Sequence, residues 1–173
     1  AIANTHQLNP EQIICGAGSD EIISLLCKAF SGPGDEVLYS QYGFLMYPIS
    51  AMAAGATPIN VLEKNYTANV DSLLKGITKK TKLVFLANPN NPTGTYIPKE
   101  ELLRLHKGLR DDIILVIDAA YAEYVIKEDY TAGNKIVEAN NNVIVTRTFS
   151  KSHGLGGLRL GWAYGSPLII DIL

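Results

Sequence analysis

Four segments of this sequence contain residue types that could do chemistry, and each follows a run of apolar residues. Three are polar clusters: Cys15–Glu21 is Gly-rich, Asn88–Gly94 is rich in Asn and Pro, and Arg147–Lys151 ends in a lysine. A fourth apolar run ends in an acid, Asp118, with Tyr121 three residues further on. Open α/β sheets bind ligands at the carboxyl ends of their parallel strands. If the apolar runs are such strands, the sequence predicts one site built from all four segments.

Lys151 and Asp118 are the main candidates for catalysis. Lys151 lies between Ser150 and a Gly-rich loop, and a lysine amine in a dry pocket can attack a carbonyl carbon. Taken alone, a solvated surface lysine is the commoner interpretation. Asp118 ends the apolar run Ile113–Ile117, where a carboxylate is costly unless a positive group or a hydrogen-bond donor meets it. A protonated pyridine nitrogen is one such partner, and a cap of a helix or loop is the alternative.

The glycines do not make a dinucleotide-binding fingerprint. After Gly16-Ala17-Gly18 the third glycine of that motif is replaced by Glu21, and after Gly154-Leu155-Gly156 it is replaced by Arg159. No GK[ST] sequence is present, so a P-loop is excluded. The first glycine pair still predicts a turn into a helix N-terminus, whose free N–H groups can bind a phosphate. A tight turn closed by a Ser19 cap is the alternative.

Strand-like and helix-like segments alternate along the chain, which predicts a largely parallel α/β sheet. The expected strands are Gln12–Cys15, Glu36–Tyr39, Thr57–Val61, Lys82–Leu86, Ile113–Asp118, Val143–Arg147 and Leu158–Tyr164. The expected helices are Ser19–Phe30, Phe44–Ala54, Val70–Ile77, Pro98–Lys107 and Asn134–Ala139. Because several strands are apolar throughout, both faces of the sheet should be covered. The expected fold is therefore three-layer α/β/α with a seven-stranded, mostly parallel sheet.

Composition excludes several classes of function. The 173 residues are 47% hydrophobic and 18% charged with a formal net charge of -2, which suits a globular domain and not a nucleic-acid-binding one. No apolar stretch reaches the ~20 residues of a membrane span, and the three histidines have no metal-ligand spacing. Cys15 and Cys27 form no CxxC pair, so we expect reduced thiols, with Cys15 buried, in the cytoplasm.

The ends of the chain suggest a piece of a longer protein. The sequence starts without Met, and it stops in the apolar segment Leu168–Leu173, just after Pro167. That segment reads as a helix without a stop signal. We therefore expect truncation at both ends.

Taken together, the clusters resemble the fold-type I enzymes that use pyridoxal 5'-phosphate (PLP), the aspartate aminotransferase superfamily, over nearly the whole chain. The matching stretches are Asn91-Pro92-Thr93-Gly94, Asp118-Ala119-Ala120-Tyr121, Ser150-Lys151 and Arg159-Leu160-Gly161. Within that superfamily the pattern is most similar to the histidinol-phosphate aminotransferase family. The stretches that carry this finer resemblance are Gly32–Leu38, Gly43–Pro48, Arg147–Lys151 and Gly157–Trp162.

The resemblance implies a role for each site residue. Lys151 would hold PLP as a Schiff base and later shuttle a proton between substrate and cofactor. Asp118 would keep the pyridine nitrogen protonated, which makes the ring an electron sink. Asn91 and Tyr121 would hydrogen-bond the phenolate oxygen of the ring. Phe44 would stack on the ring face, with ordinary core packing as the alternative.

The resemblance also implies a phosphate site. Backbone groups of Gly18, Ser19 and Asp20, the Ser150 hydroxyl and the Arg159 guanidinium would hold the cofactor phosphate. Residues 1–173 would be the large PLP-binding domain. The small C-terminal domain, with its arginine for the substrate carboxylate, and an N-terminal segment would lie outside this sequence, so we expect the isolated chain to be inactive.

The activity implied is amino-group transfer, from glutamate to imidazole-acetol phosphate, in histidine biosynthesis by a homodimer that binds neither nucleic acid nor membrane. An aromatic aminotransferase or a threonine-phosphate decarboxylase shares much of the pattern. A different class also stays open, the aminotransferase-like sensor domain of a transcription regulator, because such domains can keep the same residues.

Overall fold

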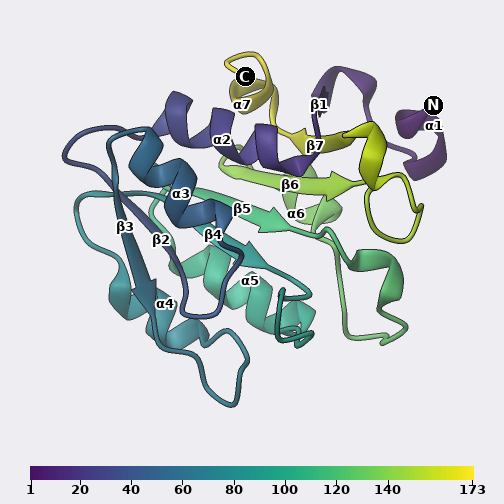
Figure 1. The fold of residues 1–173 in the computed structure, drawn as a ribbon. Coiled ribbons are helices and arrows are strands. Elements are labelled where there is room, and N and C mark those ends of the chain that lie inside the picture. Colours follow the sequence, from purple (N-terminus) through teal and green to yellow (C-terminus); the bar gives the residue numbers. More distant parts are fainter.

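A seven-stranded sheet in the order β1-β7-β6-β5-β4-β2-β3 forms the centre of the computed structural model, which describes residues 1–173 (Figure 1). The strands are β1 (Ile13–Gly16), β2 (Glu36–Ser40), β3 (Thr57–Val61), β4 (Thr81–Ala87), β5 (Ile114–Asp118), β6 (Val143–Thr148) and β7 (Gly161–Gly165). Strands β2 to β6 pair in parallel, while β7 is antiparallel to both β1 and β6. The carboxyl ends of β1 to β6 therefore lie at one edge of the sheet, and β7 starts at that edge.

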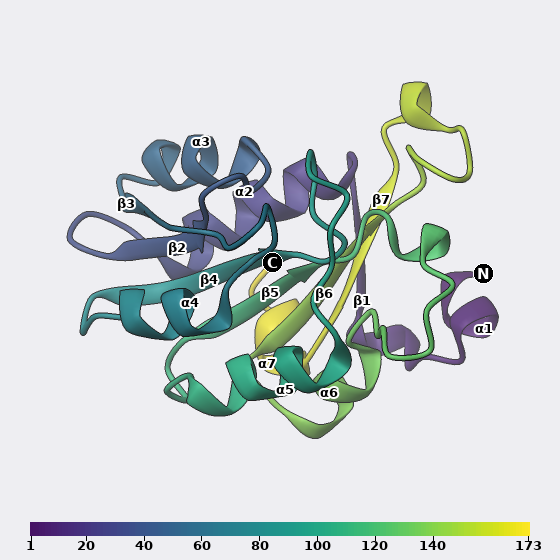
Figure 2. The same cartoon turned by 90° about the horizontal axis from the view of Figure 1, so that it is seen from below.

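Helices cover both faces of this sheet. They are α1 (Ile2–His6), α2 (Ser19–Phe30), α3 (Met46–Ala53), α4 (Val70–Gly76), α5 (Lys99–Gly108), α6 (Asn134–Ala139) and α7 (Pro167–Ile170), with 3-10 turns η1 (Pro10–Gln12), η2 (Ala122–Tyr124) and η3 (Gly156–Leu158). Side chains of α2, α3 and α7 enter one hydrophobic core, and those of α4, α5 and α6 enter the other. Figure 2 shows α2 and α3 on one side of the sheet and α5 and α6 on the other. The predicted three-layer fold is confirmed.

The two cores explain why the central strands are apolar without alternation. In β4, Leu83 and Phe85 pack into the core beneath α2 and α3, while Val84 and Leu86 pack into the core on the opposite face. All four side chains are fully buried. Each contributes about 1.5–3 kcal/mol relative to exposure. Burial on both faces holds the central strands in place, and the polar clusters follow directly from the ends of these strands.

Two predicted segments at that edge differ from the structure. Leu158–Tyr164 was expected to be a strand, but β7 begins only at Gly161, because Arg159 has a left-handed backbone with φ 48° that no strand accommodates. A Ser19 cap was the alternative interpretation of the turn before α2, but Gly18 occupies the N-cap position with φ 82°, and Ser19 is the first helical residue. That alternative is therefore wrong, and the glycine provides the turn.

Cys15 also differs from expectation. It is an exposed free thiol, whereas Cys27 in α2 is buried. Cys15 lies on β1, an edge strand of the sheet, where one long side of the strand has no neighbour. The short helix α1 and the 3-10 turns had no counterpart among the predicted elements. None of the helices combines the length and apolar character needed to cross a bilayer.

Candidate active site

A pocket opens at the edge of the sheet where β1 to β6 end and β7 begins. It contains about 530 Å³ of empty space, part of it open to solvent. The lining residues are Ser19, Asp20, Phe44, Ala87, Pro89, Asn91, Asp118, Ala120, Tyr121, Thr148, Ser150, Lys151 and Arg159. All four segments singled out in the sequence contribute to this list.

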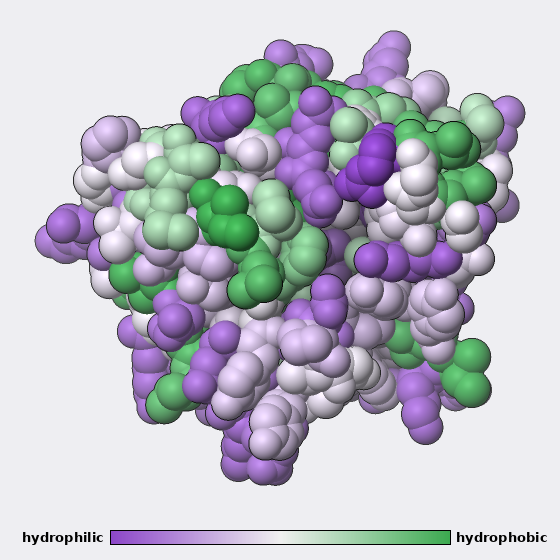
Figure 3. Space-filling model, in the orientation of Figure 1, coloured by the Kyte–Doolittle hydropathy of each residue, from purple (hydrophilic) through white to green (hydrophobic).

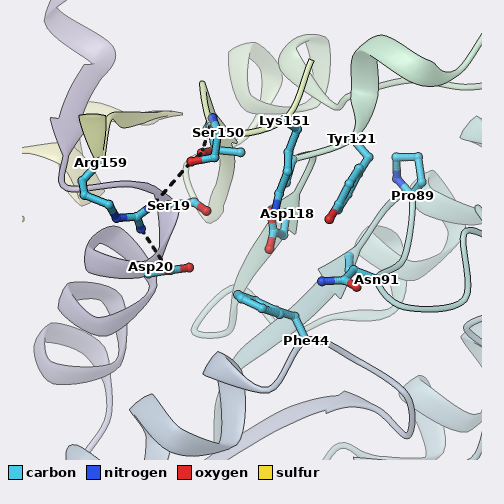
Figure 4. Close-up of a pocket in the computed structure, with 13 residues that line it drawn as sticks. Ser19, Asp20, Phe44, Pro89, Asn91, Asp118, Tyr121, Ser150, Lys151 and Arg159 are labelled. Carbon is cyan, nitrogen blue, oxygen red and sulfur yellow. Dashed lines mark hydrogen bonds and ion pairs between the residues drawn. The ribbon is translucent and has the colours of Figure 1, made fainter. Parts of the chain in front are cut away.

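The pocket has two chemically different ends (Figure 4). Arg159, Ser150, Ser19 and Asp20 gather at one end, and Asn91, Tyr121 and Pro89 lie at the other. Lys151 and Asp118 lie between them.

The structure brings together nine of the ten residues predicted to contact a cofactor: Ser19, Asp20, Phe44, Asn91, Asp118, Tyr121, Ser150, Lys151 and Arg159. The tenth, Gly18, does not line the pocket but forms the N-cap of α2 next to it. A side chain on Gly18 would lie within 2.6 Å of an Arg159 Nη2 atom.

Asp118 ends β5 as a buried carboxylate that has no ion-pair partner in the chain. Burial raises the pKa of Asp118 above its ordinary value, and the hydrogen bonds that it accepts from Tyr47, Thr146 and the Ala120 backbone act in the opposite direction. The negative charge of Asp20 raises it further. A carboxylate that is desolvated in this way favours a cationic group beside it.

Arg159 organises the other end of the pocket. Its Nη2 atom lies 3.1 Å from Asp20 Oδ2, and its Nη1 atom donates to the Gly156 carbonyl at 3.1 Å and reaches Ser150 Oγ at 3.5 Å. The N-terminus of α2 is directed to the same place, and its partial positive charge attracts anions. This end therefore combines a guanidinium, hydroxyls and free backbone N–H groups, which suits an anion with several oxygens.

A close approach between β7 and α2 creates that end. A Cβ on Gly161 would lie only 2.4 Å from both the Gly18 carbonyl carbon and the Ser19 nitrogen. Only glycine allows β7 to pass so near the start of α2. Because Arg159 precedes Gly161 by two residues, this contact places the guanidinium beside the helix N-terminus.

The loop after β4 is held by its own amides. The Asn88 side chain accepts from the Ile97 N–H at 2.8 Å and donates to the Ile97 carbonyl at 3.2 Å. The Tyr130 hydroxyl donates to the Asn88 carbonyl at 2.7 Å, and Asn90 Nδ2 donates to Thr93 Oγ1 at 2.9 Å. These bonds fix the loop that carries Asn91 into the pocket.

Several residues of the site were not predicted from the sequence. Tyr47 and Thr146 hydrogen-bond Asp118. Thr148 lines the pocket, and its hydroxyl donates to Ser150 Oγ at 3.0 Å. Ala87, Pro89 and Ala120 also line the pocket. Tyr47 stands three residues after Phe44, so helical spacing was a signal that could have linked the two. Nothing in the local sequence links Thr146 to Asp118.

The chemistry of these groups fits PLP. Asp118 is a buried carboxylate without a cation, and a protonated pyridine nitrogen would supply one. The Arg159 end suits a phosphate, and Lys151 supplies a primary amine in the same pocket. Asn91 and Tyr121, at the opposite end of the pocket from Arg159, offer hydrogen-bond donors to an oxygen on the ring. A flat aromatic face is available from Phe44.

Comparison with known proteins agrees with this geometry. The sequence model of the family "Aminotransferase class I and II" matches residues 1–173. The chain therefore belongs to the class I and II aminotransferase family.

Within this family, the chain is similar to proteins that share one name. The chain is 61% identical over all 173 residues to proteins named histidinol-phosphate aminotransferase from Ruegeria sp. (strain TM1040) and from Paramagnetospirillum magneticum, and covers 47% and 48% of them. The crystal structure of histidinol-phosphate aminotransferase from Sinorhizobium meliloti in complex with pyridoxal-5'-phosphate superposes with a TM-score of 0.92 at 27% identity. That match covers 98% of this chain and 46% of the other. The chain thus spans about half the length of the relatives it matches.

Proposed function

We propose that residues 1–173 are the cofactor-binding domain of a PLP-dependent histidinol-phosphate aminotransferase that acts in histidine biosynthesis. The observation that carries this proposal is the presence of Lys151 and Asp118 in one pocket with the Arg159 end beside them. The relatives at 61% identity, which are named for this activity, support the choice of reaction.

When bound, PLP supplies an electron sink that stabilises negative charge at the substrate Cα. The residues of the chain do the remaining work. Lys151 provides the amine that anchors the cofactor and then moves a proton to and from the substrate Cα. Asp118 keeps a proton on the ring nitrogen through its buried negative charge.

Other pocket residues would bind and orient the cofactor. Arg159, Ser150 and the backbone of Gly18, Ser19 and Asp20 at the start of α2 would hold the phosphate. Asn91 and Tyr121 would donate hydrogen bonds to the ring oxygen, and Phe44 would pack against a face of the ring. Because these residues come from different segments at one edge of the sheet, they would hold the ring from several sides.

The proposed substrates are glutamate, as amino donor, and imidazole-acetol phosphate, as acceptor. The names of the relatives support histidinol phosphate as the amino compound of the reaction. Further binding groups for these substrates would come from parts of the full-length protein outside residues 1–173.

We also propose that the full-length enzyme is a homodimer. Leu45, at the N-cap of α3, and Ile49 and Met52 within the helix are 73%, 50% and 58% exposed, and their spacing places them on one face. Figure 3 shows an apolar patch over α3. An exposed apolar stripe beside a binding site favours contact with another protein surface.

The proposed location is the cytoplasm. Both cysteines are free thiols, the state that a reducing compartment maintains.

An absorbance titration of the full-length protein tests the function. PLP is added first, glutamate second, and histidinol phosphate to a separate sample. We expect the band of lysine-bound cofactor to form and then to be lost with each amino donor. Histidine and threonine phosphate serve as comparison compounds. A band that responds to no amino compound would contradict transamination, and a response to threonine phosphate with release of carbon dioxide would indicate a decarboxylase.

A further inference from the structure

Tyr47 is a buried tyrosine of α3 whose hydroxyl contacts Asp118, a residue that lines the pocket. It is fully buried, and its hydroxyl donates to Asp118 Oδ2 at 2.8 Å. The two residues are 71 positions apart in the sequence. Tyr47 does not line the pocket itself, and its one hydrogen bond to a pocket residue is the bond to Asp118.

The packing around Tyr47 leaves its hydroxyl little freedom. Its ring stacks on Phe85 of β4 with a centroid distance of 4.6 Å and an angle of 13°. Phe44 meets it edge-on at 5.9 Å and 86°, and Tyr39 of β2 does so at 6.4 Å and 66°. Because three rings fix the phenol plane, its hydroxyl holds Asp118 Oδ2 in one orientation.

Asp118 is thus bound at both oxygens. Thr146 Oγ1 of β6 donates to Oδ1 at 3.2 Å, opposite the shorter bond from Tyr47 to Oδ2. Both donors favour the charged carboxylate, whereas burial favours its protonated form. Titratable groups of the surrounding elements are Asp20 of α2, Tyr39 of β2, Tyr130, and Tyr121, Lys151 and Arg159 of the pocket wall. The negative charge of Asp20 favours the protonated form of Asp118.

We propose that Tyr47 is a positioning residue for Asp118, holding its carboxylate in place and keeping the proton shared with the cofactor on the ring nitrogen. This inference rests on the proposed function. Without the Tyr47 hydroxyl, Asp118 becomes the stronger base, so the N–H bond of the ring is exchanged for an O–H bond on the carboxylate. A ring that has lost its proton is a weaker electron sink.

Tyr47→Phe in the full-length protein tests this, because it removes one oxygen atom and keeps the ring packing. With cofactor labelled with 15N in the ring, we expect the nitrogen resonance to move from the protonated toward the unprotonated position. In the cofactor-free protein, selective 13C labelling of aspartate should show that Asp118 titrates at higher pH in the variant. We expect kcat to fall roughly 10-fold or more, the scale of a lost hydrogen bond to a charged group, with a smaller change in KM.

Tyr39→Phe is the matched control. It removes a hydroxyl from the same aromatic cluster without touching Asp118, so both resonances should stay at their wild-type positions. Thr146→Val, which removes the longer bond, should shift them in the same direction as Tyr47→Phe but less. If Tyr47→Phe does not fold, 3-fluorotyrosine at position 47 keeps the packing and strengthens the donor. Asp118 should then titrate at lower pH in the cofactor-free protein.

The inference would be overturned if the Tyr47→Phe protein folds and matches the Tyr39→Phe control in both measurements, the nitrogen resonance and the Asp118 titration. So would an unchanged titration with 3-fluorotyrosine. Failure of the wild-type protein to bind PLP would instead contradict the proposed function, and the cofactor-free titration would still decide whether Tyr47 controls Asp118.

Discussion

The Lys151 side-chain nitrogen lies over the ring of Tyr121, 5.2 Å from the ring centroid. The two residues come from different loops at the same edge of the sheet, after β6 and β5 respectively. A cation over an aromatic face is stabilised by about 0.5–1 kcal/mol at an exposed site. The ring face of Tyr121 therefore holds the amine inside the pocket and leaves the Tyr121 hydroxyl for a separate contact.

Lys151→Ala in the full-length protein should abolish both turnover and the absorbance band of lysine-bound cofactor. The amine is the anchoring nucleophile of the proposal, and no other lysine lines the pocket. Spectra and initial rates with glutamate measure both effects. Lys135→Ala, an exposed lysine on α6, is the control and should behave as wild type. Normal turnover by Lys151→Ala would remove Lys151 from the mechanism.

Asp118→Asn should reduce kcat far more than Tyr121→Phe. Asparagine cannot hold a proton on the ring nitrogen by charge, and loss of such an electrostatic contact costs on the order of 10²-fold or more. Tyr121→Phe loses one hydrogen bond, about 10-fold, and keeps the ring face that contacts Lys151. Single-turnover kinetics of both variants give the order. The reverse order would contradict the assignment of Asp118 to the ring nitrogen.

The stability of the cofactor-free protein should depend on the ionisation of Asp118. The folded pKa of Asp118 is raised above the ordinary value of 3.8, so the folded state binds its proton more tightly than the unfolded state does. The contribution of this group is favourable below about pH 4 and is lost as the pH rises through the folded pKa. Asp118→Asn should remove that dependence and should raise the free energy of unfolding at pH 8, where the wild-type carboxylate is charged and buried.

Urea unfolding of the cofactor-free wild-type and Asp118→Asn proteins between pH 4 and pH 8 measures this effect. The two proteins should diverge as the pH increases, with the variant the more stable at the upper end. A variant that is less stable than wild type at pH 8 would show that the hydrogen bonds to Asp118 outweigh its desolvation.

Gly161→Ala should destabilise the protein and weaken phosphate binding together. The added methyl would meet the Gly18 and Ser19 backbone at 2.4 Å, so β7 must move away from the N-terminus of α2. Overpacking of this kind costs about 1–3 kcal/mol. Thermal unfolding and titration with PLP measure the two effects. Gly157→Ala, where no atom lies within 4 Å of the added methyl, is the matched control and should change neither.

Much of the fold followed from the sequence because its signals are local. The apolar runs of β4 and β5 and the amphipathic spacing of α2 depend only on neighbouring residues, and Thr57–Val61, Ser19–Phe30 and Asn134–Ala139 have the predicted boundaries. Convergence of the polar clusters also followed, since parallel strands end at one edge of a sheet. The sequence alone therefore predicts that Lys151, Asp118, Asn91 and Tyr121 lie together.

Contacts between distant segments were decided only by the tertiary structure. The bond from Tyr47 to Asp118 spans 71 positions and the ion pair of Arg159 with Asp20 spans 139. The left-handed backbone at Arg159 and the Gly18 N-cap depend on how closely β7 passes α2. Sequence periodicity places a side chain on a face of its own strand or helix, but packing across the sheet determines which groups meet. The residue types of the site were thus present in the sequence, while the protonation and orientation of Asp118 come from the fold.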